Sequence, residues 1–152
     1  MLHEIGSPIA ATEPPDLPEE AKFPAYPVAF ARAVSFPAEE RLGIDWGGLN
    51  TASSEALEQA LVDLAPDPPM HQIGGYPCPV QSDSMEAQCH DIARRLGPHG
   101  GDAADWRRLL QLDTDDEAGM MWGDVGTLYF WIREQDARAG DFSKTWMILQ
   151  CH

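Results

Sequence analysis

The C-terminal half of the chain contains three short apolar runs of strand length. They are residues 106–113 (WRRLLQLD), 125–133 (VGTLYFWIR) and 146–151 (WMILQC). Short runs rich in aromatic and branched side chains are typical of strands in a sheet. The segment 114–124, which joins the first two runs, has roughly ten residues, more than the about two to five of a tight hairpin turn. We therefore predict three strands, with an acidic loop between the first and the second.

Two helices are predicted before these strands. The first begins at Ser53 or Ser54, where a hydroxyl can cap free amide groups, and ends before Pro66. The second begins at Asp83, whose spacing from Glu86 resembles a capping box, and ends at Gly97. Both segments repeat apolar residues at helical spacing: Leu57, Ala60, Leu61 and Leu64 in the first, and Met85, Cys89, Ile92, Ala93 and Leu96 in the second.

The N-terminal region has a different composition. Residues 1–24 contain five prolines among acidic residues, so we expect an extended or disordered Pro-rich arm. From residue 26 onward, bulky side chains alternate with alanines, which predicts a strand with one bulky and one small face. The bulky positions are Val28, Phe30, Val34 and Phe36.

Together these elements predict the fold class α+β, with a largely antiparallel sheet and two packed helices. A chain of 152 residues with 43% hydrophobic content can bury one core of this kind. We expect residues 25–152 to form a single domain. Within it, residues 71–81 hold paired glycines and two prolines beside Cys78, which predicts an irregular loop leading into the second helix.

The formal net charge of -15 argues against nucleic-acid and membrane partners, because both present negative charges to the protein. The three cysteines, Cys78, Cys89 and Cys151, are an odd number without a C-x-x-C pair, which is typical of reduced thiols. We find no signal peptide pattern and no apolar run of the roughly 20 residues that a membrane span needs. We therefore expect a soluble, cytoplasmic protein.

The acidic loop matches part of a calcium-binding pattern. Asp113, Asp115, Glu117 and Asp124 match positions one, three, five and twelve of a calcium-binding loop. However, Ala118 stands where the turn needs glycine, Asp124 is shorter than the usual glutamate, and the flanking segments are predicted strands, not helices. We expect no bound metal and no cofactor.

An enzyme is the first alternative interpretation. His71, Cys78 or the acidic loop at 113–124 could serve a hydrolase or a metal-dependent enzyme if folding brought them together. Against it, the chain has no G-x-S-x-G motif and no phosphate-binding loop, and its histidines and cysteines lack the spacing of a zinc site. The sequence therefore favours a protein without catalytic activity.

The preferred interpretation is a non-catalytic acidic protein-binding module. Negative charge attracts a basic protein or peptide, and Trp122 beside the carboxylates supplies an apolar anchor. The predicted binding residues are Asp113, Asp115, Asp116, Glu117, Trp122 and Asp124.

Four ordered sequence blocks resemble a known family. They are residues 71–77 (HQIGGYP) followed by Gln81, residues 110–113 (LQLD), 122–130 (WGDVGTLYF) and 141–144 (DFSK). Over roughly residues 71–152 the chain resembles the YwqG-like family. The resemblance implies a bacterial protein of a family mainly of unknown function, with an α+β fold of many antiparallel strands. Some members are encoded near toxin and immunity systems, a neighbourhood that is compatible with an immunity-like role but does not assign one.

The resemblance implies a usually longer family architecture, of which this chain matches the C-terminal part. Strands that would pair with the remaining portion would then be exposed, or would be covered by a second copy. A structural self-association module, present as a homodimer, is therefore the second alternative.

Overall fold

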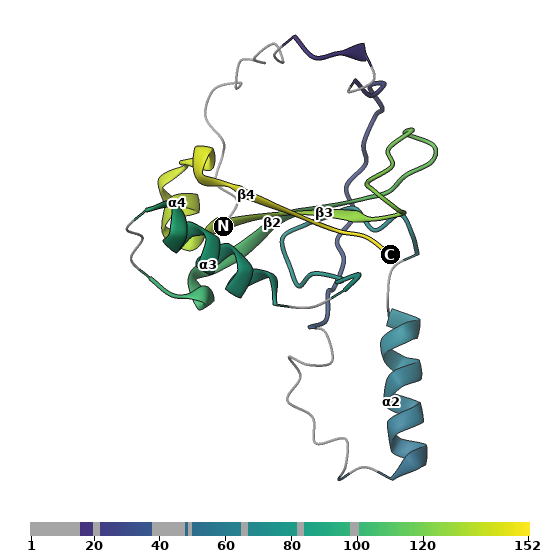
Figure 1. Ribbon diagram of the computed structural model, residues 1–152. Coiled ribbons are helices and arrows are strands. Elements are labelled where there is room, and N and C mark those ends of the chain that lie inside the picture. Colours follow the sequence, from purple (N-terminus) through teal and green to yellow (C-terminus); the bar gives the residue numbers. More distant parts are fainter. Residues whose placement is uncertain are drawn as a thin grey trace.

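A four-stranded antiparallel sheet organises the computed structural model (Figure 1), which describes residues 16–19, 22–37, 48, 50–64, 67–81, 84–97 and 101–152. Its strands are β1 (Gln72–Ile73), β2 (Trp106–Asp113), β3 (Thr127–Arg133) and β4 (Trp146–Gln150), in the order β1-β2-β3-β4. The helices are α2 (Thr51–Leu64), α3 (Met85–Leu96) and α4 (Glu134–Ala139), with 3-10 turns η3 (Ala103–Asp105) and η4 (Phe142–Lys144). The fold class is α+β, which confirms the sequence prediction.

The three predicted C-terminal strands are present. β2 has the predicted bounds, while β3 begins at Thr127 and β4 ends at Gln150, each slightly inside the predicted run. β1 was not predicted, because its two residues are too short to show an alternating pattern. α4 was not predicted either, since its six residues, EQDARA, carry no apolar stripe.

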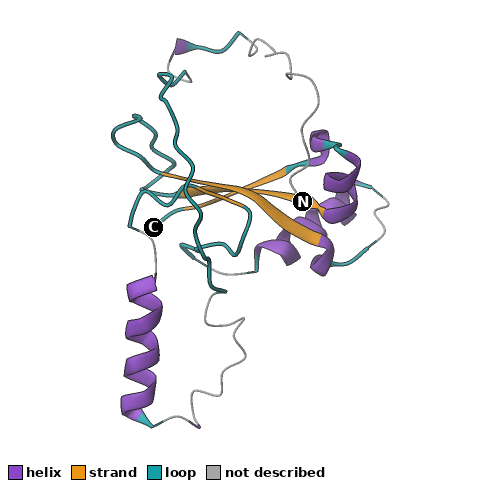
Figure 2. Cartoon of the chain, turned by 180° about the vertical axis from the view of Figure 1, so that it is seen from behind, coloured by secondary structure: helices purple, strands orange, loops and turns teal. Residues whose placement is uncertain are grey.

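The two predicted helices are present, but they differ in burial. α3 presents Met85, Cys89 and Ala93 to the sheet, and all three are buried. α2 has no buried residue and extends away from the sheet (Figures 1 and 2). The predicted start of the second helix at Asp83 lies outside the described residues. Among the described helices, none has both the length and the apolar character required to cross a bilayer.

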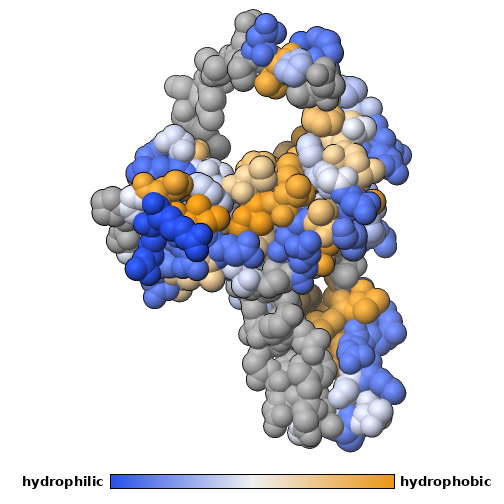
Figure 3. Space-filling view, in the orientation of Figure 1, coloured by the Kyte–Doolittle hydropathy of each residue, from blue (hydrophilic) through white to orange (hydrophobic). Residues whose placement is uncertain are grey.

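The core lies between α3 and one face of the sheet. Gln111, Tyr129 and Ile148 are neighbours in one row across β2, β3 and β4, and all are buried. On the opposite face, the corresponding row contains Met147, which is 50% exposed. Figure 3 shows hydrophobic surface over the middle of the molecule, in the region where β4 lies in Figure 1.

The predicted strand beginning at residue 26 is wrong. Residues 22–37 form no strand, and they run as one long path past the end of the sheet (Figures 1 and 2). Alternation specifies two faces, but a strand also needs a neighbour for its backbone groups, and this segment has none among the described residues. Much of the predicted arm at 1–24, including residues 1–15, lies outside the described residues.

The loop 70–81 is held to the sheet by polar side chains of the buried face. Arg108 donates hydrogen bonds from its guanidinium to the carbonyl oxygens of Gln72 (3.3 Å), Gly74 and Tyr76 (2.9 Å). Burial lowers the pKa of Arg108 to about 10, so the group stays charged at neutral pH. Its positive charge is therefore stabilised by carbonyl dipoles of the loop.

Two glutamines complete this attachment. Gln111 accepts a hydrogen bond from the Cys78 amide (3.0 Å) and donates one to the Met70 carbonyl (3.0 Å). Gln150 accepts hydrogen bonds from the amides of Val80 (3.0 Å) and Gln81 (3.1 Å). Beyond β1, whose backbone pairs with β2, the loop follows an irregular path, and side chains of the sheet pair with its backbone groups.

We expect Gln111→Leu to lower the free energy of unfolding by about 2 kcal/mol, because it removes two partly buried hydrogen bonds, from the Cys78 amide and to the Met70 carbonyl. Urea unfolding measures the loss, and hydrogen exchange at the Cys78 amide should accelerate. The matched control is Gln81→Leu, at an exposed position whose single side-chain bond to the Cys151 carbonyl is worth about 1 kcal/mol. Equal losses in the two variants would contradict the attachment.

Candidate functional site

The predicted acidic loop, residues 113–124, is a folded hairpin that extends beyond the sheet; we call it the acidic hairpin (Figure 1). Asp115 and Met120 exchange two backbone hydrogen bonds of 2.9 Å each. At its base, the amide and hydroxyl of Thr114 both donate to the Gly126 carbonyl, at 3.1 and 2.8 Å. These bonds give the hairpin a defined shape.

Two of its carboxylates are used to hold the hairpin. Asp113 accepts hydrogen bonds from the Thr127 hydroxyl (2.7 Å) and from the Met70 amide (2.9 Å). Asp115 accepts bonds from the amides of Glu117 (2.9 Å) and Ala118 (3.2 Å). Both carboxylates therefore act mainly as internal acceptors.

The other three carboxylates of the acidic hairpin are free to meet a partner. Asp116, Glu117 and Asp124 are exposed. No Lys or Arg occurs between Arg108 and Arg133, so basic residues close in sequence do not offset their charge. The structure thus divides the predicted carboxylates into a supporting pair and an exposed trio, a division that spacing alone cannot reveal.

Trp122 is half-buried and already has partners within the chain. Its indole N–H donates to the Asp113 carbonyl at 3.0 Å, and its ring meets Phe23 edge-on, with centroids 5.4 Å apart. The more exposed apolar side chains nearby are Met121 and Val125, at 52% and 53%. Sequence reasoning missed both, although each lies within three residues of Trp122. The binding role assigned to the six residues stays a prediction.

His71 connects the acidic hairpin to the loop 70–81. Its Nδ1 accepts a hydrogen bond from the Asp113 amide (3.1 Å), which places the ring hydrogen on Nε2, and this donates to Asp115 Oδ2 (3.1 Å). Because both ring nitrogens are used, the imidazole has no free lone pair to act as a base. His71 therefore holds the loop 70–81 against the acidic hairpin.

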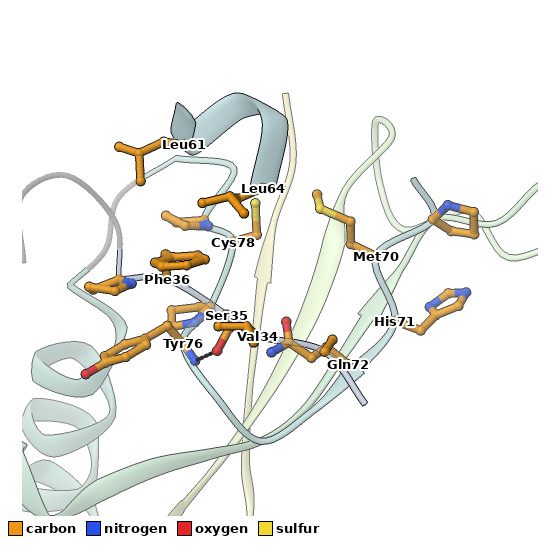
Figure 4. Close-up of a pocket in the computed structure, with 15 residues that line it drawn as sticks. Val34, Ser35, Phe36, Leu61, Leu64, Met70, His71, Gln72, Tyr76 and Cys78 are labelled. Carbon is orange, nitrogen blue, oxygen red and sulfur yellow. Dashed lines mark hydrogen bonds between the residues drawn. The ribbon is translucent and has the colours of Figure 1, made fainter. Parts of the chain in front are cut away.

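An apolar pocket of about 310 Å³ lies beside His71 (Figure 4). Three segments contribute its walls: residues 33–37, the C-terminal end of α2 and the loop 69–79. Most of its lining side chains are apolar: Val34, Phe36, Leu61, Leu64, Met70 and Tyr76. The sequence contained no signal for this pocket, since its walls come from three segments that meet only after folding.

Cys78 also lines this pocket, but its thiol is not activated. Loss of solvent around the sulfur raises its pKa, and the nearby charge of Asp113 raises it further. A neutral thiol is a poor nucleophile, so the His71 and Cys78 arrangement gives the hydrolase alternative no support. Among the described residues, no group of three or more His, Cys, Asp or Glu side chains is placed to hold a metal ion.

Val125, next to the acidic hairpin, has a backbone conformation that is unusual for its side chain. Its φ of 47° lies in the left-handed region, which a β-branched residue rarely adopts. The side chain is 53% exposed, so burial contributes little to offset this cost. The conformation allows the Gly126 amide to donate to the Trp122 carbonyl at 2.8 Å and close the turn.

The pKa of Asp115 is lowered from its ordinary value of about 4, because it accepts hydrogen bonds from His71 and from the Ala118 and Glu117 amides. Since the pKa in the folded protein lies below that in the unfolded chain, these bonds contribute stability above about pH 4. The contribution disappears as the pH falls through the lower value. In NMR spectra, we expect the Glu117 and Ala118 amides to shift with a midpoint below pH 4. Asp115→Ala should abolish this transition, and a midpoint above pH 4 would refute the assignment.

We expect Val125→Asn to raise the free energy of unfolding by about 1 kcal/mol, because asparagine tolerates the left-handed region better than a β-branched residue. Thermal and urea unfolding measure the gain. Val62→Asn, at an exposed position in α2, serves as the control and should give no gain. A loss of stability in Val125→Asn would mean that the valine side chain makes a compensating contact.

Comparisons with known proteins assign the chain to a family. A family model described as "Domain of unknown function (DUF1963)" matches residues 12–151, nearly the whole chain. A search of the curated proteins finds none that matches the chain. The match covers the acidic hairpin, the pocket and every strand of the sheet. The chain therefore belongs to the DUF1963 family of domains of unknown function.

Proposed function

We propose that the protein is a non-catalytic binding module for a basic protein or peptide. The observation that carries the proposal is the position of His71, a residue at the edge of the apolar pocket whose ring bonds to Asp115 of the acidic hairpin. The apolar pocket and the acidic hairpin, which carries three exposed carboxylates, are therefore adjacent. Together they are complementary to a segment in which an apolar residue lies near Lys or Arg residues.

In this proposal the predicted site residues have two roles. Asp116, Glu117 and Asp124 attract the basic side chains of the partner, and the net charge of -15 speeds the encounter. A second group keeps the hairpin in shape and meets the partner little or not at all: Asp113, Asp115 and Trp122. A partner side chain of moderate size fills the pocket.

A binding role without catalysis is supported by the chemistry of the two best candidates. His71 has both ring nitrogens in hydrogen bonds, and the raised pKa of Cys78 keeps its thiol neutral. We further propose that the chain is YwqG-like and works in the bacterial cytoplasm, on the basis of its four sequence blocks. An immunity-like role fits this proposal, because blocking a basic protein requires binding and no chemistry.

Anisotropy with labelled peptides tests the proposal. We expect a peptide made only of Lys and Leu to bind, with affinity that falls as salt is added, and a Glu and Leu peptide not to bind. The triple variant D116N/E117Q/D124N should bind the Lys and Leu peptide about ten-fold more weakly, because exposed ion pairs contribute about 0.2–1 kcal/mol each.

The matched control is E55Q/E58Q/D91N, which removes the same charge from exposed positions on α2 and α3. Equal weakening in both triple variants would show that only net charge matters, and would remove the acidic hairpin from the site. A Lys and Ser peptide separates the pocket from the charge. If it binds as tightly as the Lys and Leu peptide, the pocket has no part in recognition.

A further inference from the structure

Residues 26–36 carry several large apolar side chains that the described part of the chain leaves mostly exposed. We call residues 26–36 the arm segment. Its side chains Val28, Phe30 and Val34 are 76%, 79% and 72% exposed, among the highest values for large apolar residues in the described chain. Among the described residues, no backbone hydrogen bond joins this segment to the rest of the protein. It therefore presents both apolar side chains and free backbone groups.

Contacts near both ends nevertheless hold the arm segment in place. The Tyr26 hydroxyl donates to the Glu117 carbonyl of the acidic hairpin (2.7 Å), and Ser35 Oγ accepts a hydrogen bond from the Tyr76 amide (2.9 Å; Figure 4). A segment tied at two points loses less conformational entropy on binding than a free tail. The exposed side chains are thus presented in a restrained conformation.

The charge of the arm segment suits contact between two copies of this acidic chain. The 18 residues between Glu20 and Glu39 contain no Asp or Glu, which makes this the longest stretch of the sequence without a carboxylate. They include Lys22 and Arg32. Two molecules that each carry a charge of -15 repel one another over most of their surfaces, and this repulsion is smallest where carboxylates are missing.

The arm segment is also complementary to itself. If two copies pair antiparallel about Ala31, position 30 faces position 32 of the partner, 28 faces 34 and 26 faces 36. This register gives a cation–π pair of Phe30 with Arg32, an aliphatic pair and an aromatic pair. Alanines 29 and 33 face each other across the small side of the ribbon.

We propose that the arm segments of two copies pair as antiparallel strands, centred on Ala31, and join the protein into a symmetric dimer. The contact is isologous, because each copy offers the same surface to the other. Pro27, which has no amide hydrogen, then lies opposite Ser35 of the register. The two types of pair alternate along an antiparallel ladder, so if Ala31 forms a non-hydrogen-bonded pair, Pro27 does as well. At such a position the amide does not bond to the partner strand, so the missing hydrogen of Pro27 removes no bond.

Cysteine cross-linking tests both the contact and its register, in a C78S/C151S background that removes the native thiols outside the core. Ala31→Cys should form a disulfide-linked dimer on mild oxidation, because non-hydrogen-bonded partners have Cα atoms about 4.5 Å apart, within the range of disulfides. Ala29→Cys alone should not, because its two copies lie about 14 Å apart in this register. Mixing the Ala29→Cys and Ala33→Cys proteins should restore the cross-link.

Sedimentation equilibrium gives an independent measurement on the native chain. We expect a reversible dimer, and Val28→Asp should weaken it at least about ten-fold, since the symmetry removes the Val28 and Val34 pair twice and places a carboxylate opposite each Val34. Val62→Asp, at an exposed apolar position on α2, is the control and should leave the dimer unchanged. A monomer at all concentrations would overturn the proposal. An unchanged dimer affinity in Val28→Asp would also overturn it, because the dimer would then form through another surface, such as the β4 edge.

Discussion

The attachment of the loop 70–81 to the sheet is the constraint on which the rest of the structure depends. Arg108, Gln111 and Gln150 project from the buried face and satisfy the backbone of a loop that cannot pair with itself. A buried polar group left without a partner costs free energy, so these side chains favour the loop conformation that supplies their partners. The loop in turn carries His71 and one wall of the apolar pocket.

The geometry of the candidate site depends on that attachment. His71 reaches the acidic hairpin because the loop holds it beside β2, and Asp115 accepts its hydrogen bond while also closing the hairpin tip. The carboxylates are therefore not equivalent: some hold the scaffold, and others remain exposed. This arrangement favours binding, because the internal hydrogen bonds of the hairpin are already formed and little conformational entropy is lost when a partner binds.

Much of the fold could be predicted because the relevant signals are local. The bounds of β2 and the apolar stripe of α3 follow from spacing between neighbours in sequence. The site was less predictable. The aromatic ring of Trp122 sits beside carboxylates in the sequence, yet its contact with Phe23 joins residues nearly one hundred positions apart. The pocket was not predicted at all, since spacing carries no information about which distant segments meet.

The amino-acid sequence alone specified the α+β class, the three main strands and the negative charge of the hairpin, because these depend on composition and on short-range periodicity. Only tertiary structure decided which carboxylates are exposed and that both nitrogens of His71 are used. It also decided that the alternating residues after position 26 pair with no strand in the described part of the chain. The physical reason is the same in each case. Hydrogen-bond partners and burial depend on residues that are far apart in the chain. A local sequence pattern indicates only that a polar group needs a partner, not which residue supplies it.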